Sequence, residues 1–230
     1  MSKFFDMDSP VMRFLNRMAD MIILNILLII CCIPIITAGA AFTAMHYVLL
    51  KMVRDEEGYL VRGFFKSFAQ NFRQATLIWL LMLLIIAVYV GDWLIFGYSG
   101  VVFPRVLIVG VMALGIVILM VSMYVFPLLA RFDNTIRKTI NNATLLAFAN
   151  LPKTVLMAVF YALPFVIGYF SAYSFIFIVM FGFSVPAYGA AWLYSNIFKK
   201  FEPEEEPITS DMDFSINVER GEEETNGKAE

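Results

Sequence analysis

Four long stretches without a charged side chain constrain this chain more than any other feature. Residues 21–50, 74–91, 106–130 and 154–198 contain no Asp, Glu, Lys or Arg. A helix needs about 20 consecutive apolar residues to cross the ~30 Å hydrocarbon core of a bilayer. The last stretch is long enough for two crossings, with a turn near residues 169–174. These stretches predict an all-α fold, a polytopic bundle of transmembrane helices.

The first stretch decides how many times the chain crosses the membrane. A single helix over residues 21–50 would be about 45 Å long, well beyond the hydrocarbon thickness, and Pro34 and Gly39 punctuate helices. A hairpin here gives six crossings, which we favour, whereas one long helix gives five, which stays a rival arrangement. The second arm of the hairpin is short for a full span and is compatible with a partly re-entrant segment.

Basic residues indicate the orientation, because Lys and Arg in short loops favour the cytoplasmic side. With six crossings, 14 of the 15 basic residues that precede residue 201 lie inside, and Arg105 alone lies outside. With five crossings the division is 11 inside against 4 outside. We therefore predict a multi-pass membrane protein with both termini in the cytoplasm.

The residues before the second charge-free stretch predict a helix at the membrane surface. Val61, Phe65, Phe68 and Phe72 recur at helical spacing, and polar or basic residues take the opposite face. Such a cytoplasmic amphipathic helix can place its bases at lipid phosphates and its phenylalanines among acyl chains. Residues 131–153 repeat this character, whereas nucleic-acid binding would need a broader basic field. The opposite face of the first segment carries Arg62, Lys66, Gln70 and Arg73.

The end of the chain differs in composition from everything before it. Residues 201–230 hold 11 of the 19 acidic residues, and their only bases are Arg220 and Lys228. Almost no apolar residue is present there, so this segment cannot bury enough surface to fold. We predict a transmembrane helical domain over residues 1–200, followed by an acidic, disordered tail over residues 201–230.

Few side chains are suited to catalysis or to metal binding. His46 is the one histidine, and the two cysteines are adjacent, so no metal site is assembled. No nucleophile–base pair and no phosphate-binding glycine loop is recognisable as a motif. The charge-free stretches also lack the midplane ionisable residue that ion-coupled carriers use. We expect neither enzymatic activity nor a cofactor. Uncharged polar groups in the spans could line a path for a neutral solute or bond between helices; they include Asn25, Thr43, His46 and Ser122.

Two segments resemble a known family of membrane proteins. The stretch "NILLIICCIPIITAGAAF", continued to "RGFFKSFAQNFRQATLIW", resembles the opening of the YesL-like proteins of Gram-positive bacteria, a domain of unknown function. The stretch "RFDNTIRKTINNATLLAFANLPKT" is similar to the family's later cytoplasmic segment. The resemblance covers about residues 10–200. It rests on Asn25, Pro34, Thr37, Gly39, Phe65, Phe68, Asn71, Phe72, Asn142, Phe148, Asn150 and Pro152.

The resemblance implies a setting rather than a reaction. It brings no catalytic residues, and it implies a bacterial plasma membrane and an accessory role in carbohydrate uptake. We expect a non-catalytic protein that binds a partner, such as the permease of a carbohydrate ABC transporter, or membrane lipids. The alternative is a facilitator or channel for a small neutral solute such as a sugar. Pro186 joins the candidates because Gly-Ala-Ala, a close-packing stripe, follows both it and Pro34. The candidate structural or interaction residues are Asn25, Pro34, Thr37, Gly39, His46, Phe68, Asn71, Asn142, Phe148, Asn150 and Pro186.

Overall fold

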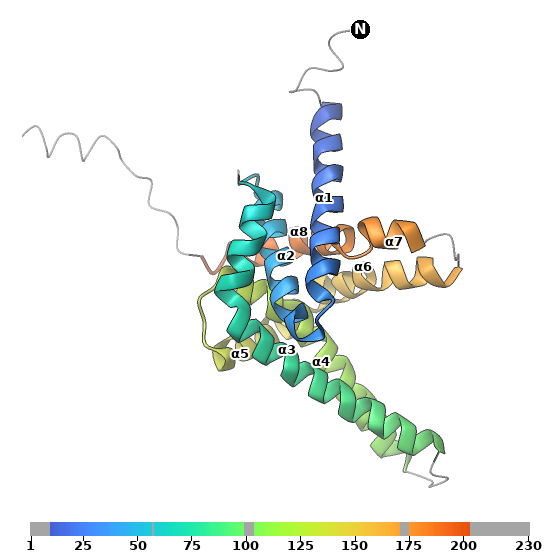
Figure 1. Ribbon diagram of the computed structural model, residues 1–230. Coiled ribbons are helices and arrows are strands. Elements are labelled where there is room, and N and C mark those ends of the chain that lie inside the picture. Colours follow the sequence, from blue (N-terminus) through green and yellow to red (C-terminus); the bar gives the residue numbers. More distant parts are fainter. Residues whose placement is uncertain (1–9, 57, 99–103, 171–174, 203–230) are drawn as a thin grey trace, which may run out of the picture. The chain divides into compact units, whose positions relative to one another are not determined.

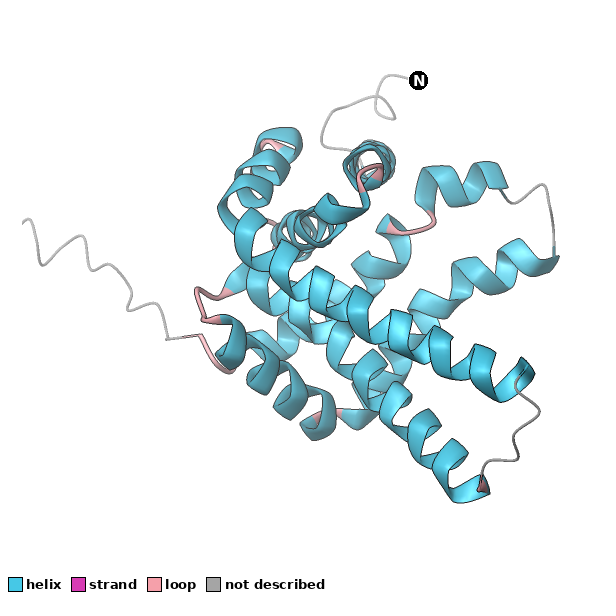
Figure 2. Cartoon of the chain, turned by 60° about the horizontal axis from the view of Figure 1, so that its bottom comes forward, coloured by secondary structure: helices cyan, strands magenta, loops and turns pink. Residues whose placement is uncertain are grey.

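The computed structural model describes residues 10–56, 58–98, 104–170 and 175–202. Within these residues every regular element is a helix, which confirms the predicted all-helical fold (Figure 1). Figure 2 shows the same helices from another side, with the described loops in pink. Residues 203–230 of the predicted acidic tail lie outside the described residues. The helices are α1 (Pro10–Cys32), η2 (Ile35–Thr37), α2 (Ala38–Val53), α3 (Leu60–Tyr98), α4 (Arg105–Arg131), α5 (Ile136–Ala149), α6 (Leu151–Phe170), α7 (Phe175–Phe181) and α8 (Ser184–Phe198).

Five helical segments are long and apolar enough to cross a membrane. They lie in α1, in η2 with α2, in α3, in α4 and in α6, which supports a multi-pass membrane protein. The last charge-free stretch holds α6 and then two shorter helices. α7 has 7 residues and α8 has 15, so neither alone has the length of a span. The sequence did not predict this division.

The chain turns sharply between α1 and α2, where a hairpin was predicted. Pro34 precedes η2 and cannot continue α1. The Thr37 hydroxyl donates to the carbonyl oxygens of Cys31 at 2.5 Å and Pro34 at 2.8 Å. Carbonyls at a helix end have no partner inside the helix, so these bonds stabilise the turn. Residues 21–50 therefore form two helices, whereas the five-span arrangement assumed one.

α2 lies at the centre of the core, packed against α1, α3 and α4. Gly39 allows its closest approach to α3, since a Cβ at this position would lie 2.5 Å from the Ala75 carbonyl oxygen. The Trp79 indole of α3 contacts the Phe42 ring, with centroids 6.0 Å apart. The same indole donates from Nε1 to the Ile35 carbonyl oxygen at 2.7 Å. A hydrogen bond and a ring contact of Trp79 thus hold the tip of the α1–α2 hairpin against the middle of α3.

The two halves of α3 have different surroundings. At 1.5 Å per residue its 39 residues make a rod of about 58 Å, nearly twice the hydrocarbon thickness. Phe64, Ala75 and Ile78 of the first half are buried. From Leu80 onward no described side chain of α3 is buried, and this half runs beside α4 (Figure 1). α4 is divided in the same way, because its buried residues all lie near its end, between 124 and 130.

The phenylalanine face predicted at the start of α3 is exposed, and a different face of the helix packs inside the protein. Phe64 and Ser67 are buried, whereas Phe65 and Phe72 are 47% and 39% exposed. Exposed rings beside exposed bases suit the predicted interfacial helix, because the rings can enter acyl chains while the bases stay at the phosphates. The exposed bases of this half are Arg62, Lys66 and Arg73.

We expect the α1–α2 tip to end inside the membrane, because it reaches only the start of the lipid-exposed half of α3. Ile33, Ile35 and Ile36 at the tip are more than half exposed, which is unfavourable in water. In a variant lacking both native cysteines, Ile36→Cys should resist a membrane-impermeant maleimide added outside intact cells. Gly97→Cys, near the end of α3, should react. Equal labelling would show that the hairpin crosses completely.

Gly39 tests the packing of α2 on α3. Gly39→Ala should lower the free energy of unfolding by roughly 1–3 kcal/mol, because the added methyl group overlaps the backbone of α3. Gly110→Ala is the matched control, since nothing lies within 4 Å of its Cβ position. Thermal unfolding of the purified variants in detergent measures the difference. Equal midpoints for the two variants would contradict the packing described above.

Candidate functional site

Asn25 is the most heavily bonded polar side chain of the interior, and it is fully buried on α1. Its Nδ2 donates to the carbonyl oxygen of Val179 at 2.6 Å. Its Oδ1 accepts from the backbone N–H groups of Phe183 and Ser184, both at 3.0 Å. One amide thus caps the end of α7 and the beginning of α8, where the backbone groups lack helical partners. Asn25 therefore has a structural role, because it satisfies backbone groups at the break between α7 and α8.

His46 and Tyr194 form a second buried contact, between α2 and α8. The Nδ1 atom of His46 lies 2.9 Å from the Tyr194 hydroxyl oxygen, and the rings meet edge to face. Next to this pair, Arg54 donates from Nε to the Ser195 hydroxyl oxygen at 3.2 Å. His46 therefore joins α2 to α8. Within the described residues no group of three His, Cys, Asp or Glu side chains could hold a metal ion.

A third contact joins α4 to α6. The Tyr124 and Thr154 hydroxyl oxygens are 3.0 Å apart, and both side chains are buried. Thr154 also donates to the Ala147 carbonyl oxygen of α5 at 3.0 Å. Neither Tyr124 nor Tyr194 is among the residues predicted from the sequence. Tyrosines in apolar runs give no pattern of their own, so only the tertiary structure shows that their hydroxyls meet partners.

The four polar groups that could have lined a solute path do not share a space. Thr43 donates to the Gly39 carbonyl oxygen of its own helix at 2.9 Å, and Ser122 donates to that of Leu119 at 2.6 Å. Asn25 and His46 make the contacts described above. Each group thus bonds inside a helix or between two helices, and none is directed at the others.

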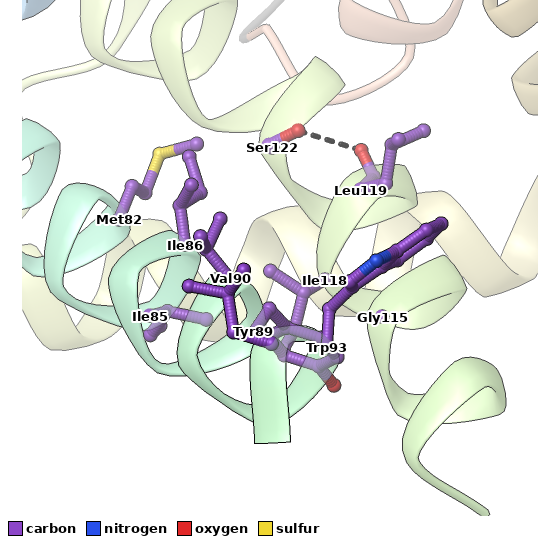
Figure 3. Close-up of a pocket in the computed structure, with 11 residues that line it drawn as sticks. Met82, Ile85, Ile86, Tyr89, Val90, Trp93, Gly115, Ile118, Leu119 and Ser122 are labelled. Carbon is purple, nitrogen blue, oxygen red and sulfur yellow. Dashed lines mark hydrogen bonds between the residues drawn. The ribbon is translucent and has the colours of Figure 1, made fainter. Parts of the chain in front are cut away.

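A groove of about 600 Å³ lies between the outer halves of α3 and α4 (Figure 3). The Tyr89 ring of α3 rests on Gly115 of α4, where a Cβ would lie 3.2 Å from the ring. The Tyr89 hydroxyl donates to the Val111 carbonyl oxygen at 3.1 Å, so its polar end is already bonded. This contact ties the two outer halves together. Other lining residues are Met82, Ile85, Ile86, Val90, Trp93, Leu94, Ile118, Leu119 and Ser122.

The groove offers hydrocarbon and the aromatic side chains of Tyr89 and Trp93. In Figure 3 Trp93 extends from α3 toward α4, and its side chain is 78% exposed. The hydroxyl of Ser122 is engaged with its own helix. A groove of this composition can take an acyl chain or apolar side chains of another helix, because neither requires a hydrogen-bond partner. Its lining contains no His, Asp, Glu, Lys or Cys side chain.

The remaining candidates on α3 and α5 lie apart from one another. Phe68 is half-buried, with its ring 5.6 Å from that of Phe72, and Asn71 donates to the Ser67 carbonyl oxygen of its own helix at 3.1 Å. Phe148 is 48% exposed on α5, and no ring contact joins it to Phe68 within the described residues.

Asn142, Asn150 and Pro186 occupy three different local settings. Asn142 is exposed on α5. Asn150 closes α5 by donating to the Leu146 carbonyl oxygen at 3.2 Å. Pro186 lies in the first turn of α8, where a missing N–H does little harm. The Gly-Ala-Ala stripe after it packs closely, since a Cβ on Gly189 would lie 3.2 Å from the Phe160 ring of α6.

A known protein family matches the part of the chain that contains the α1–α2 hairpin. The model of a family described as "Protein of unknown function, DUF624" matches residues 21–93. The matched part contains most of α1, all of α2 and most of α3, and the family's description assigns no activity. No curated protein and no solved structure matches the chain. The chain is thus similar to this family in the segment that carries Asn25, Gly39 and Trp79.

Asn25 should be more important for stability than any exposed amide of α1. Asn25→Leu leaves two backbone N–H groups and a carbonyl group without partners, which should cost about 2–3 kcal/mol of unfolding free energy. Asn16→Leu is the matched control, because Asn16 is exposed on the same helix. Thermal unfolding in detergent measures both. A midpoint for Asn25→Leu equal to that of the control would contradict the capping role.

Proposed function

We propose that the chain is a non-catalytic accessory membrane protein that binds a transmembrane helix of a partner along the α3–α4 groove. The partner class that we propose is the permease of a carbohydrate ABC transporter. This choice rests on the resemblance to the YesL-like proteins of bacterial plasma membranes. In this proposal the chain lies in such a membrane with both of its termini in the cytoplasm.

The observation that carries the proposal is the division of α3 and α4 into two halves. Their inner halves pack in the core, whereas their outer halves bury no described side chain and touch chiefly each other. A two-helix hairpin that stands clear in lipid keeps its apolar groove open for another helix. Trp93 supplies the kind of large, exposed anchor that dominates the energetics of interfaces.

A facilitator for a neutral solute is the weaker candidate. Such a protein needs polar side chains that face a common space, and the four that the sequence suggested for this role are bonded separately. Transport through the interior would first have to break the Asn25 and His46 contacts. Binding along the apolar hairpin requires no such rearrangement.

Photo-crosslinking tests the proposed groove. A benzoylphenylalanine probe at Ile86 or Leu119, which line the groove, should form an adduct with a permease subunit in native membranes. The matched control is the same probe at Leu84, which is 62% exposed on α3 but does not line the groove. It should label lipid. Adducts of equal yield at all three positions, or lipid adducts alone, would refute partner binding in the groove.

A further inference from the structure

A second cleft, of about 380 Å³, lies far along α3 from the groove, at the start of that helix. It is formed by the end of α2, the turn that follows, the first two turns of α3 and one residue of α1. Its lining combines charged residues with aromatic and apolar ones, whereas the α3–α4 groove is lined by no charged residue. The charged lining residues are the bases Lys51, Arg62 and Lys66 and the acids Asp20 and Glu56.

The charges of this cleft do not neutralise one another. The ion pair that the described residues contain joins Arg17 to Asp55, and neither is one of the five charged groups just named. Lys51 lies over the Tyr47 ring, with its Nζ 5.2 Å from the ring centroid. Three bases and two acids thus line one space without pairing, and their donors and acceptors are available to a ligand.

The turn that shapes the cleft is held in an unusual conformation. Asp55 has a φ of 54°, the left-handed region that non-glycine residues seldom adopt. The N–H of Glu56 donates to the Lys51 carbonyl oxygen at 3.0 Å, as in a Schellman motif. Arg17 of α1 binds both the Asp55 carboxylate and the Met52 carbonyl oxygen. Helix α1 therefore fixes the turn that presents Glu56.

The position of the cleft fits a membrane surface. Arg62 and Lys66 belong to the same turns of α3 as Phe65, which is 47% exposed. An apolar stripe next to a basic stripe is the arrangement of a helix that lies between headgroups and acyl chains. A ligand that reaches the bases while its apolar part follows the phenylalanines is a phospholipid.

We propose that this cleft binds the phosphodiester of a membrane phospholipid. Lys51, Arg62 and Lys66 donate to the phosphate oxygens, with the planar guanidinium of Arg62 suited to two of them. Asp20 and Glu56 accept from hydroxyl or ammonium groups of the same headgroup. Phosphatidylglycerol and phosphatidylethanolamine carry both a phosphate and such donors, whereas phosphatidylcholine lacks the donors. The site does not depend on the identity of the protein partner proposed above.

Native mass spectrometry of the full chain in detergent, titrated with each of the three lipids, tests this site. We expect tighter binding of phosphatidylglycerol and phosphatidylethanolamine than of phosphatidylcholine. Arg62→Gln with Lys66→Gln should weaken binding of the first two by about 30-fold, on the order of fivefold for each base. Glu56→Gln should reduce the preference over phosphatidylcholine.

The matched control removes the same two charges elsewhere. Arg137→Gln with Lys138→Gln changes two exposed bases of α5 and should alter binding by less than about twofold, because screening weakens distant charges. Unfolding midpoints should be equal for both double variants. Equal loss of lipid in the two double variants would overturn the site. Release of the lipid by inorganic phosphate would show a site for a soluble anion and would also overturn the proposal.

Discussion

Backbone groups at broken helices need partners wherever water is excluded, and this requirement organises the whole interior. Asn25 supplies both donor and acceptor to the break between α7 and α8. Thr37 and Trp79 supply donors to carbonyl oxygens of the α1–α2 turn. Gln74 donates to the Asn134 carbonyl oxygen, at 2.5 Å, in the loop before α5. Because these polar side chains are committed to the backbone, few are left to line a path through the bundle.

The same requirement explains why function is better sought on surfaces than inside. The core ends where α3 and α4 lose their neighbours, and from there the two helices continue as an apolar hairpin. α3 is continuous over 39 residues, so one rigid element carries both proposed sites. The phospholipid cleft lies at its start, and the α3–α4 groove lies along its outer half.

Hydrophobic patterning predicted the helices, but it did not predict which face of α3 packs inside the protein. The hairpin near Pro34 was predicted from length, because a 30-residue helix exceeds the membrane. The inward face of α3 was not, since Phe64 and Phe65 are equally apolar although one is buried and the other 47% exposed. In a membrane protein, lipid-facing and core-facing positions both favour apolar residues. Periodicity alone therefore cannot distinguish core-facing from lipid-facing positions. In α3 the contacts with α2 determine which residues are buried.

The sequence by itself determined that the chain is helical and membrane-spanning, because charge-free runs of this length are stable only as hydrogen-bonded helices in lipid. It also determined where the long helices turn, through Pro34 and the charged connections. Only the tertiary structure decided what Asn25, His46 and Tyr194 do, and that Lys51 joins Arg62 and Lys66 in one cleft. Those partners are up to 159 residues apart in sequence, as Asn25 and Ser184 are. Packing, rather than spacing, brings such groups within the few ångströms over which hydrogen bonds and charges act.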